Sequence, residues 1–479
     1  MLEIIKGVKN QVPFKYFEEI SKIPRASGNE KEIADYLVEF ARGLNLNYFR
    51  DEHNNVLIVK EASKGRENDE PIMLQAHTDM VAEKNVSTVH NFLKDPIKLV
   101  QEGNILRADG TTLGADDGFG VAIMMAVLAD NEISSPLIEC LFTSSEEIGL
   151  VGASKFDYSK ISSKRMVNLD SAEEDTVIIG CCGGVRTELS VPVSFKSGDY
   201  DGIKITIGGL CGGHSGEDIN KNRLNSNVIM GKVIKDIANV SSVGVAYIHG
   251  GDKDNAIPRE CEAVVVPQDK LEECYKLASL IEESYKANGI VKADEDSGLF
   301  IKAQYVKSDK CASFEDTDKI LKVLSAPNAI LKFRETPPIL PEISRNLARV
   351  RTNENSIDVC FSSRSYHDSG INESLRELDG IAKEVGGSTY HHERYPGWAS
   401  DKDSKLVTDY QNAFYKIAGK KPEPTLIHAG LECGLISGAI ENFVAISVGC
   451  NVHDLHTPKE TMELDSMDRV YEAIIEMLK

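Results

Sequence analysis

Apolar residues in the first 185 positions alternate between helical spacing and short uninterrupted runs. One helix face joins four apolar positions, Ile33, Leu37, Phe40 and Leu44. Ser27 and Asn29 stand just before this stretch, where a helix cap is expected. Uniformly apolar runs predict a buried helix at residues 118–128 and buried strands at residues 55–59, 72–75, 138–142 and 166–169. Buried strands that alternate with helices indicate an α/β fold, with a mostly parallel sheet covered by helices.

The pattern changes near residue 186. Two strands of alternating polarity, a long amphipathic helix and a strand–helix–strand pattern are predicted at residues 187–195, 203–207, 270–287 and 298–365. Buried-sheet character returns after residue 390, with a helix at 404–418 and a strand at 443–448. We therefore expect a discontinuous α/β domain of residues 1–185 and 390–479, interrupted by an inserted α+β domain of residues 186–389. Two related halves within the insertion remain an open alternative.

Composition narrows the class of protein. The chain has 479 residues, 41% of them hydrophobic, which suffices for a large core. Its formal net charge of −21 argues against nucleic acid or an anionic membrane as the main partner. The ten cysteines include no CxxC pair and are expected to be buried reduced thiols. Neither a signal-length apolar stretch at the N-terminus nor a run of about 20 apolar residues is present, so a cytoplasmic protein is predicted.

Five segments place a histidine or a carboxylate directly beside or just beyond a predicted apolar strand or helix. They comprise HTD at 77–79, DD at 116–117, EE at 146–147, Asp170 and His456. Each segment alone fits an ordinary role, as a structural histidine, helix-capping acids or a surface loop. The carboxyl ends of parallel strands meet at one edge of a sheet, so we expect the whole set to converge there.

Two imidazoles and three carboxylates would form a suitable cage for two metal ions if one carboxylate bridges them. Mg²⁺ and Ca²⁺ prefer oxygen ligands alone, so the histidines favour zinc, with manganese or cobalt as alternatives. Three carboxylates and one hydroxide would balance the charge of two divalent cations. One further carboxylate would then be free to move protons.

The order HTD, GADDG, SSEEIG, NLD and a late histidine resembles the M20 family of dizinc peptidases. The segments IPRASGNE, TTLGAD, GGHSGEDI, NAIPRE, RYPGW and HAGLECGL are similar to the aminoacyl-histidine dipeptidase branch, which includes Xaa-His dipeptidases and bacterial carnosine-cleaving enzymes. The resemblance covers nearly the whole chain. It implies that residues 1–185 and 390–479 form the catalytic domain and that residues 186–389 form a lid.

The resemblance also implies a role for each metal ligand. Asp116 would bridge both metals. His77 and Asp170 would complete one site, and Glu147 and His456 would complete the other. None of the five ligand positions departs from the family pattern. Asp117, next to Asp116, stands where some relatives have asparagine, but it is not a ligand.

Two further carboxylates have catalytic roles by the same resemblance. Glu146 would be the general base, and Asp79 would orient His77. A hydroxide bridging the metals would attack the substrate carbonyl, while Glu146 takes its proton and later passes a proton to the leaving amine.

In the lid, the resemblance implies that His214 stabilises the oxyanion. It also implies that Asn255 and Arg364 bind the C-terminal carboxylate of the substrate. The ordinary alternatives are a glycine-rich turn, a structural turn and a surface charge. His428 and Glu432 are expected to line the pocket near the substrate amine, with simple packing as the alternative. Because the lid and the metals lie in separate domains, we expect lid closure to assemble the site.

The predicted function is hydrolysis of small unblocked dipeptides, including Xaa-His substrates, by a cytoplasmic metal-dependent dipeptidase. A homodimer through the lid is left open. Alternatives within the superfamily are a tripeptidase, a carboxypeptidase and an N-acyl amino acid deacylase. A non-catalytic metal-dependent binding protein would not require Glu146, and an all-carboxylate Mg²⁺ phosphohydrolase would not require the two histidines.

Overall fold

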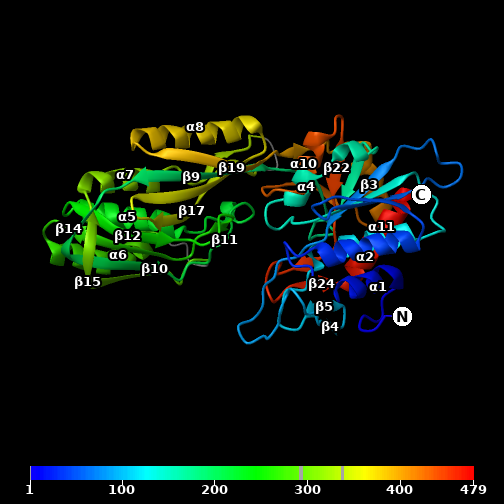
Figure 1. Ribbon diagram of the computed structural model, residues 1–479, viewed down its shortest axis with the longest axis horizontal. Coiled ribbons are helices and arrows are strands. Elements are labelled where there is room, and N and C mark those ends of the chain that lie inside the picture. Colours follow the sequence, from blue (N-terminus) through cyan, green and yellow to red (C-terminus); the bar gives the residue numbers. More distant parts are fainter. Residues whose placement is uncertain (1, 291–294, 336–338) are drawn as a thin grey trace. The chain divides into compact units, whose positions relative to one another are not determined.

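The computed structural model describes residues 2–290, 295–335 and 339–479 (Figure 1). The chain divides into two compact units, which we call unit 1 and unit 2. Unit 1 comprises Met1–Cys181, Trp398–Ile427 and Leu431–Lys479. Unit 2 comprises Cys182–Gly397 and His428–Gly430. The limits expected from the sequence were 185/186 and 389/390.

The main sheet of unit 1 has the strand order β1-β2-β6-β3-β7-β22-β8-β20, with β21 paired to β8. These strands are β1 Asn47–Arg50, β2 Val56–Lys60, β3 Ile72–His77, β6 Ile138–Thr143, β7 Arg165–Asn168, β8 Thr176–Cys181, β20 Trp398–Ala399, β21 Glu423–Ile427 and β22 Val444–Ser447. The central strands β6, β3, β7 and β22 run parallel to one another. The expected α/β class with a mostly parallel sheet is confirmed.

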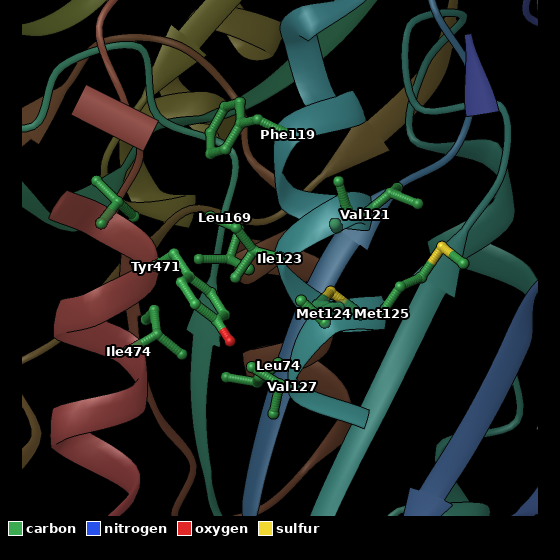
Figure 2. Close-up of a cluster of buried hydrophobic side chains, with 14 of the residues drawn as sticks. Leu74, Phe119, Val121, Ile123, Met124, Met125, Val127, Leu169, Tyr471 and Ile474 are labelled. Atoms are coloured by element: carbon green, nitrogen blue, oxygen red, sulfur yellow. The ribbon is translucent and has the colours of Figure 1, made fainter. Parts of the chain in front are cut away.

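Helices cover both faces of this sheet. They are α1 Gln11–Ile20, α2 Lys31–Gly43, α3 Ala115–Ala129, α4 Val151–Lys155, α9 Lys405–Ala418, α10 Glu432–Ala439 and α11 Leu464–Leu478, with a short 3₁₀ turn at Tyr158–Lys160. Successive residues of β3 point to opposite faces, so Leu74 packs in the cluster of α3 and α11, and Met73 packs in the cluster of α10. Figure 2 shows the first cluster, in which α3 side chains meet Leu74, Tyr471 and Ile474. Most buried residues of the central strands β6, β3, β7 and β22 are apolar, as expected for strands that are covered on both sides.

One local expectation for unit 1 is corrected, and one small sheet was not anticipated. Helix α2 begins at Lys31 with Glu30 at its N-cap, and neither Ser27 nor Asn29 caps it. The Ser27 hydroxyl instead donates to Asp79 at 2.7 Å, so a tertiary hydrogen bond has replaced the local one. An antiparallel sheet in the order β23-β24-β5-β4 was not expected from the pattern. Its strands are β4 Leu99–Glu102, β5 Ile105–Ala108, β23 Val452–His453 and β24 Thr461–Glu463.

Unit 2 contains an antiparallel sheet in the order β15-β10-β14-β12-β17-β18-β9-β19, with β16 paired to β17. Its strands are β9 Gly183–Pro192, β10 Phe195–Gly208, β12 Val243–Gly250, β14 Cys261–Pro267, β15 Phe300–Ala312, β16 Ala329–Phe333, β17 Pro341–Thr352, β18 Ser356–Ser365 and β19 Ser388–Tyr395. A separate ladder joins β11 Gly213–His214 to β13 Ala256–Ile257, near a 3₁₀ turn at Ile219–Lys221. Helices α5 Ser226–Ala238, α6 Leu271–Ala287, α7 Phe314–Leu324 and α8 Asp368–Glu384 share one hydrophobic cluster with the sheet. The expected α+β character of the insertion is therefore observed as a separate antiparallel unit.

The unit 2 sheet consists of two halves with the same topology. One half runs β10-α5-β12-β14-α6-β15, and the other combines β9 with α7-β17-β18-α8-β19. The halves meet where β12 pairs with β17 through two residue pairs, His249↔Arg351 and Gly250↔Val350. Side chains extend this short ladder, because the Thr352 hydroxyl accepts from the Ile248 N–H and donates to its carbonyl.

All ten cysteines lie in the described part of the chain and are free thiols. Nine are buried as expected, but Cys211 is exposed, because the glycine-rich loop that carries it lies outside the sheet. Among the described residues, no helix combines the length and apolar character needed to cross a bilayer.

Candidate metal centre

The ends of three neighbouring strands bring the predicted ligands together. In the parallel ladders of β3, His77 is opposite Thr143 of β6, and Gln75 is opposite Asn168 of β7. The chain after each strand therefore leaves the sheet at the same edge. The acidic residues that follow β6 and β7 start from positions beside His77.

Asp116 lies between the two histidines. Its Oδ1 is 3.0 Å from His77 Nε2, and its Oδ2 is 3.2 Å from His456 Nε2. Asp170 Oδ1 lies 3.7 Å from His77 Nε2, and Glu147 Oε1 lies 3.0 Å from His456 Nε2. Two groups of ligand atoms result, and each carboxylate oxygen of Asp116 faces one group.

Each of these groups is compact enough for one cation. The ligand atoms of His77, Asp116 and Asp170 lie within 4.8 Å of one another, and the same holds for Asp116, Glu147 and His456. A third group of this size contains His77, Glu146 and Glu147, so Glu146 lies beside the cage. Mixed imidazole and carboxylate donors suit zinc and related transition metals better than Mg²⁺ or Ca²⁺. The donor set therefore fits two divalent cations that share Asp116.

Asp79 is buried behind His77. Its carbonyl oxygen lies 3.1 Å from His77 Nδ1, and its carboxylate Oδ1 lies 3.4 Å from the same nitrogen. The Asp79 carboxylate also accepts the backbone N–H groups of Glu146 at 2.9 Å and Glu147 at 3.2 Å. One side chain thus contacts the His77 ring and fixes the backbone of the acidic loop.

The ionisation of this cluster reflects crowded charge. Burial acts against the charged imidazolium of His456, but hydrogen bonds to Asp116 and Glu147 raise its pKa to about 11. Burial also acts against the Asp116 carboxylate, but hydrogen bonds from His456 and His77 hold its pKa well below the usual range. Burial and the neighbouring Glu147 carboxylate raise the pKa of Glu146. The carboxylates therefore attract positive charge, and divalent cations would replace the imidazolium protons as its source.

The residues predicted for substrate binding lie partly in unit 2. Arg364 on β18 is 3% exposed. It donates to the Tyr395 hydroxyl at 2.8 Å, and its Nη2 lies 3.3 Å from His214 Nε2. Asn255 is exposed, and its carbonyl oxygen accepts the Ser215 N–H at 2.8 Å. His214, Asn255 and Arg364 therefore converge on one region of unit 2.

His428 and Glu432 are both buried. In unit 2, His428 Nε2 lies 2.7 Å from the Ser344 hydroxyl, and burial together with the nearby Arg364 lowers the pKa of His428 to about 3. In unit 1, Glu432 accepts hydrogen bonds from Gln75 at 2.5 Å and Thr143 at 2.7 Å. Burial raises the pKa of Glu432 to about 7.

Comparison with known proteins decides the family. The sequence pattern of Peptidase family M20/M25/M40 matches residues 73–479. The cytosol non-specific dipeptidase of Escherichia coli (strain K12) is 33% identical to the chain over 468 residues, which cover 97% of this chain and 96% of that protein. The chain is an M20 peptidase. The family recognised from the motifs is confirmed, and the protein is a hydrolase that acts on peptide bonds.

Solved structures agree with this M20 assignment. Aminoacylhistidine dipeptidase from Vibrio alginolyticus matches with a TM-score of 0.80 and 32% identity, covering 98% of this chain and 96% of that one. Aminopeptidase PepT from Bacillus cereus matches with a TM-score of 0.57 and 16% identity, covering 98% of both chains. The second likeness shows the shared fold alone.

Several residues that support the M20 site were given no role in the site by the sequence analysis. Arg25, Ser27 and Glu30 belong to IPRASGNE, and Glu460 ends the segment HTPKE. Glu30 accepts from the Ser145 N–H at 3.1 Å and from the Ser145 hydroxyl at 2.8 Å, next to the acidic loop. The sequence shows only that these two segments contain charged residues. Their role becomes clear once the structure identifies the groups that they contact.

Proposed function

We propose that this M20 peptidase is a metal-dependent dipeptidase that hydrolyses small unblocked dipeptides, including Xaa-His substrates. The supporting observation is the position of Asp116, whose two carboxylate oxygens each face a separate group of ligand atoms. The Escherichia coli relative is named a dipeptidase, and the Vibrio alginolyticus relative is named an aminoacylhistidine dipeptidase. Both cover nearly the whole chain.

We assign the proposed ligands as the sequence predicted them. His77 and Asp170 would hold one cation, Glu147 and His456 would hold the other, and Asp116 would bridge them. Zinc is the proposed metal, with manganese or cobalt as alternatives. When bound, two such cations make a water molecule more acidic and polarise the substrate carbonyl.

The remaining chemistry belongs to side chains of the protein. Glu146 lies beside the cage, and its raised pKa suits a group that accepts a proton from water and then donates it to the leaving amine. Asp79 would hold the His77 ring in a fixed orientation. His214 is the proposed hydrogen-bond donor to the oxyanion.

Arg364 is the proposed binding residue for the C-terminal carboxylate of the substrate, with Asn255 beside it. Its guanidinium is almost fully buried, and its nitrogens donate to the hydroxyls of Tyr395 and Ser215. Its Nε has no hydrogen-bond partner in the described chain. A buried cation of this kind favours an anionic ligand, and a planar guanidinium suits a carboxylate.

Arg364→Lys is expected to raise KM for a dipeptide and to lower kcat/KM about 10- to 100-fold, because a lysine cannot reproduce a paired hydrogen bond. The metal content should not change, since Arg364 belongs to unit 2. Steady-state kinetics on a dipeptide and on the corresponding dipeptide amide provide the measurement. The preference for the free carboxylate should disappear in the variant. Equal preference in variant and wild type would show that Arg364 does not bind this group.

The substrate class is tested by hydrolysis of a defined panel after restoring zinc, manganese or cobalt. The panel contains Xaa-His dipeptides, other dipeptides, a tripeptide and an N-acyl amino acid, with a chelated sample as the control. Preferred cleavage of dipeptides is the expected result. Cleavage confined to the tripeptide or to the acylated amino acid would instead favour one of the alternative activities of the superfamily.

Three further assignments concern location, assembly and the remaining pocket residues. We propose a cytoplasmic location, because the Escherichia coli relative is named a cytosol enzyme and the cysteines are free thiols. The homodimer through residues 186–389 stays a prediction. The assignment of His428 and Glu432 to substrate binding also stays a prediction, and both side chains already hold hydrogen bonds within their own units.

A further inference from the structure

The turn that presents Asp116 is held by a buried carboxylate. Glu460 is 2% exposed and accepts four consecutive backbone N–H groups. Its Oε2 binds Leu113 N at 2.7 Å and Gly114 N at 3.0 Å, and its Oε1 binds Ala115 N at 2.8 Å and Asp116 N at 3.3 Å. One side chain therefore satisfies every amide of the turn just before the shared ligand.

A buried cation holds the same turn at a carbonyl group. Arg25 is 2% exposed and donates to the carbonyl oxygen of Gly114. It also donates to the carbonyl oxygens of Thr78 at 3.0 Å and Asp79 at 3.1 Å. The direct hydrogen-bond partners of Arg25 are therefore three carbonyl oxygens. Burial lowers its pKa, and the charge of Glu460 is the main opposing influence.

Two glycines of LGADDG make room for this guanidinium. Gly114 has φ +68°, and a Cβ there would lie 2.6 Å from Arg25 Nη2. A Cβ at Gly118 would also lie 2.6 Å from Arg25 Nη2. Both contacts are shorter than any Cβ tolerates, so the glycine spacing of the motif matches the presence of Arg25.

The two charged residues also connect the other ligand segments to this turn. Arg25 binds the carbonyl oxygens of the two residues that follow His77. Glu460 lies four positions after His456, and its backbone N–H closes a turn onto Thr457 at 3.0 Å. The backbone segments that carry His77, Asp116 and His456 are therefore tied together by one cation and one anion, neither of which lies among the ligand groups.

We propose that Arg25 and Glu460 are positioning residues that fix the Asp116 turn, and with it the geometry of both metal sites. The inference rests on the proposed metal centre. A bridging ligand must match two cations at once, so small movements of its backbone weaken both sites. Contacts outside the ligand shell commonly change metal affinity about 10- to 100-fold.

Cobalt binding to the full-length chain tests this role. Glu460→Gln and Arg25→Lys are prepared as metal-free proteins and titrated with Co²⁺, with calorimetry for affinity and stoichiometry and visible absorption for coordination geometry. Glutamine keeps the size of Glu460 but places an NH₂ group against backbone N–H donors. Lysine keeps the charge of Arg25 but cannot reach three carbonyl oxygens with a planar fork. Each variant should bind Co²⁺ about 10- to 100-fold more weakly than the wild type and show an altered visible spectrum.

Matched controls separate positioning from a general loss of stability. Glu18 is 4% exposed and accepts the backbone N–H groups of Glu3, Ile4 and Ile5, so Glu18→Gln removes a similar carboxylate far from the cage in sequence. Arg345 is fully buried in unit 2 and donates to Ser374, so Arg345→Lys is the control for Arg25. Both controls should keep wild-type Co²⁺ affinity and spectrum, whatever they do to Tm.

The outcomes are distinguishable. Co²⁺ affinity and spectra of the Glu460 and Arg25 variants that equal those of the controls would overturn the positioning role while leaving the proposed function intact. A wild-type chain that binds no pair of Co²⁺ ions would overturn both proposals. If Glu460→Gln does not fold, Glu460→Asp keeps the charge but shortens its reach, and the same weakening is expected. Activity of Arg25→Lys that excess Co²⁺ restores would support a loss of affinity rather than of chemistry.

Discussion

Asp116→Asn should bind fewer than one equivalent of divalent metal and lose peptidase activity on the order of 10³-fold, because metal polarisation supplies several kcal/mol of transition-state stabilisation. The carboxylate oxygens of Asp116 lie 3.0 Å and 3.2 Å from the two histidine nitrogens that face them. An amide keeps the size of the side chain but offers one neutral oxygen, so it cannot serve both cations. Elemental analysis after dialysis, together with kcat/KM on a dipeptide, provides the measurement.

Asp117→Asn is the matched control, since it makes the same change one position along the chain. Asp117 is fully buried, and its Oδ2 accepts the backbone N–H of His77 at 3.2 Å. Burial raises the pKa of Asp117 well above its ordinary value, so the neutral amide resembles the protonated acid. This variant should retain two metals. Retention of two metals by Asp116→Asn as well would refute the bridging role.

Glu146→Gln should keep both metals and lose about 10²-fold or more in kcat, as expected when a general acid/base is removed. Its KM should change little, because the proposed role of Glu146 lies in proton transfer rather than in substrate binding. Glu146 and Glu147 both fall in a compact group with His77, so geometry alone permits either to be a ligand. Kinetics at increasing zinc or manganese concentration distinguish the two carboxylates.

Glu147→Gln is the partner variant in that experiment. Its activity should recover at high metal concentration, because the proposed loss is a loss of affinity, whereas Glu146→Gln should not recover at any concentration. The reverse pattern would exchange the roles of the two residues. Full activity of Glu146→Gln without added metal would remove Glu146 from the proposed mechanism.

The proposed ligand residues could be singled out from the sequence because each lies next to or just beyond a predicted apolar strand or helix and has a side chain that can bind a metal. A mostly apolar run that stops at a histidine or a carboxylate marks the edge of a buried parallel strand, as at His77, which ends β3, and at Asp170, which follows β7. Local patterns sufficed for these positions. The order of the strands in the sheet was not needed to expect that their carboxyl ends meet.

The residues that hold this arrangement could not be identified in the same way. Glu460 and Leu113 are 347 positions apart, and Arg25 and Gly114 are 89 positions apart. Glu460 binds backbone amides, which every residue except proline carries, so the sequence does not indicate which residues are its partners. Ser27 was expected to cap a helix for the same reason, since its true partner, Asp79, is distant in sequence. Long-range contacts of side chains with backbone leave little trace in local composition.

The fold of unit 2 shows another limit of the pattern. Strand β9 pairs with β18 and β19, which follow it only after the whole first half of the sheet. Alternating polarity predicts that such a segment is a strand but does not identify its neighbours. Pairing of this kind depends on how the complete unit packs around its core.

The short ladder between β12 and β17 makes the middle of the unit 2 sheet unusually dependent on side chains. Ten residue pairs join β18 to β9, but two join β12 to β17, and the Thr352 hydroxyl supplies the next pair of bonds. Most sheets gain cohesion from main-chain bonds that any sequence can make. At the junction of β12 and β17, the hydrogen bonding between the two halves depends on the side chain at position 352. Since Arg364, the residue proposed to bind the substrate carboxylate, lies on β18 beside β17, substitutions along this junction have a route to Arg364 without touching it.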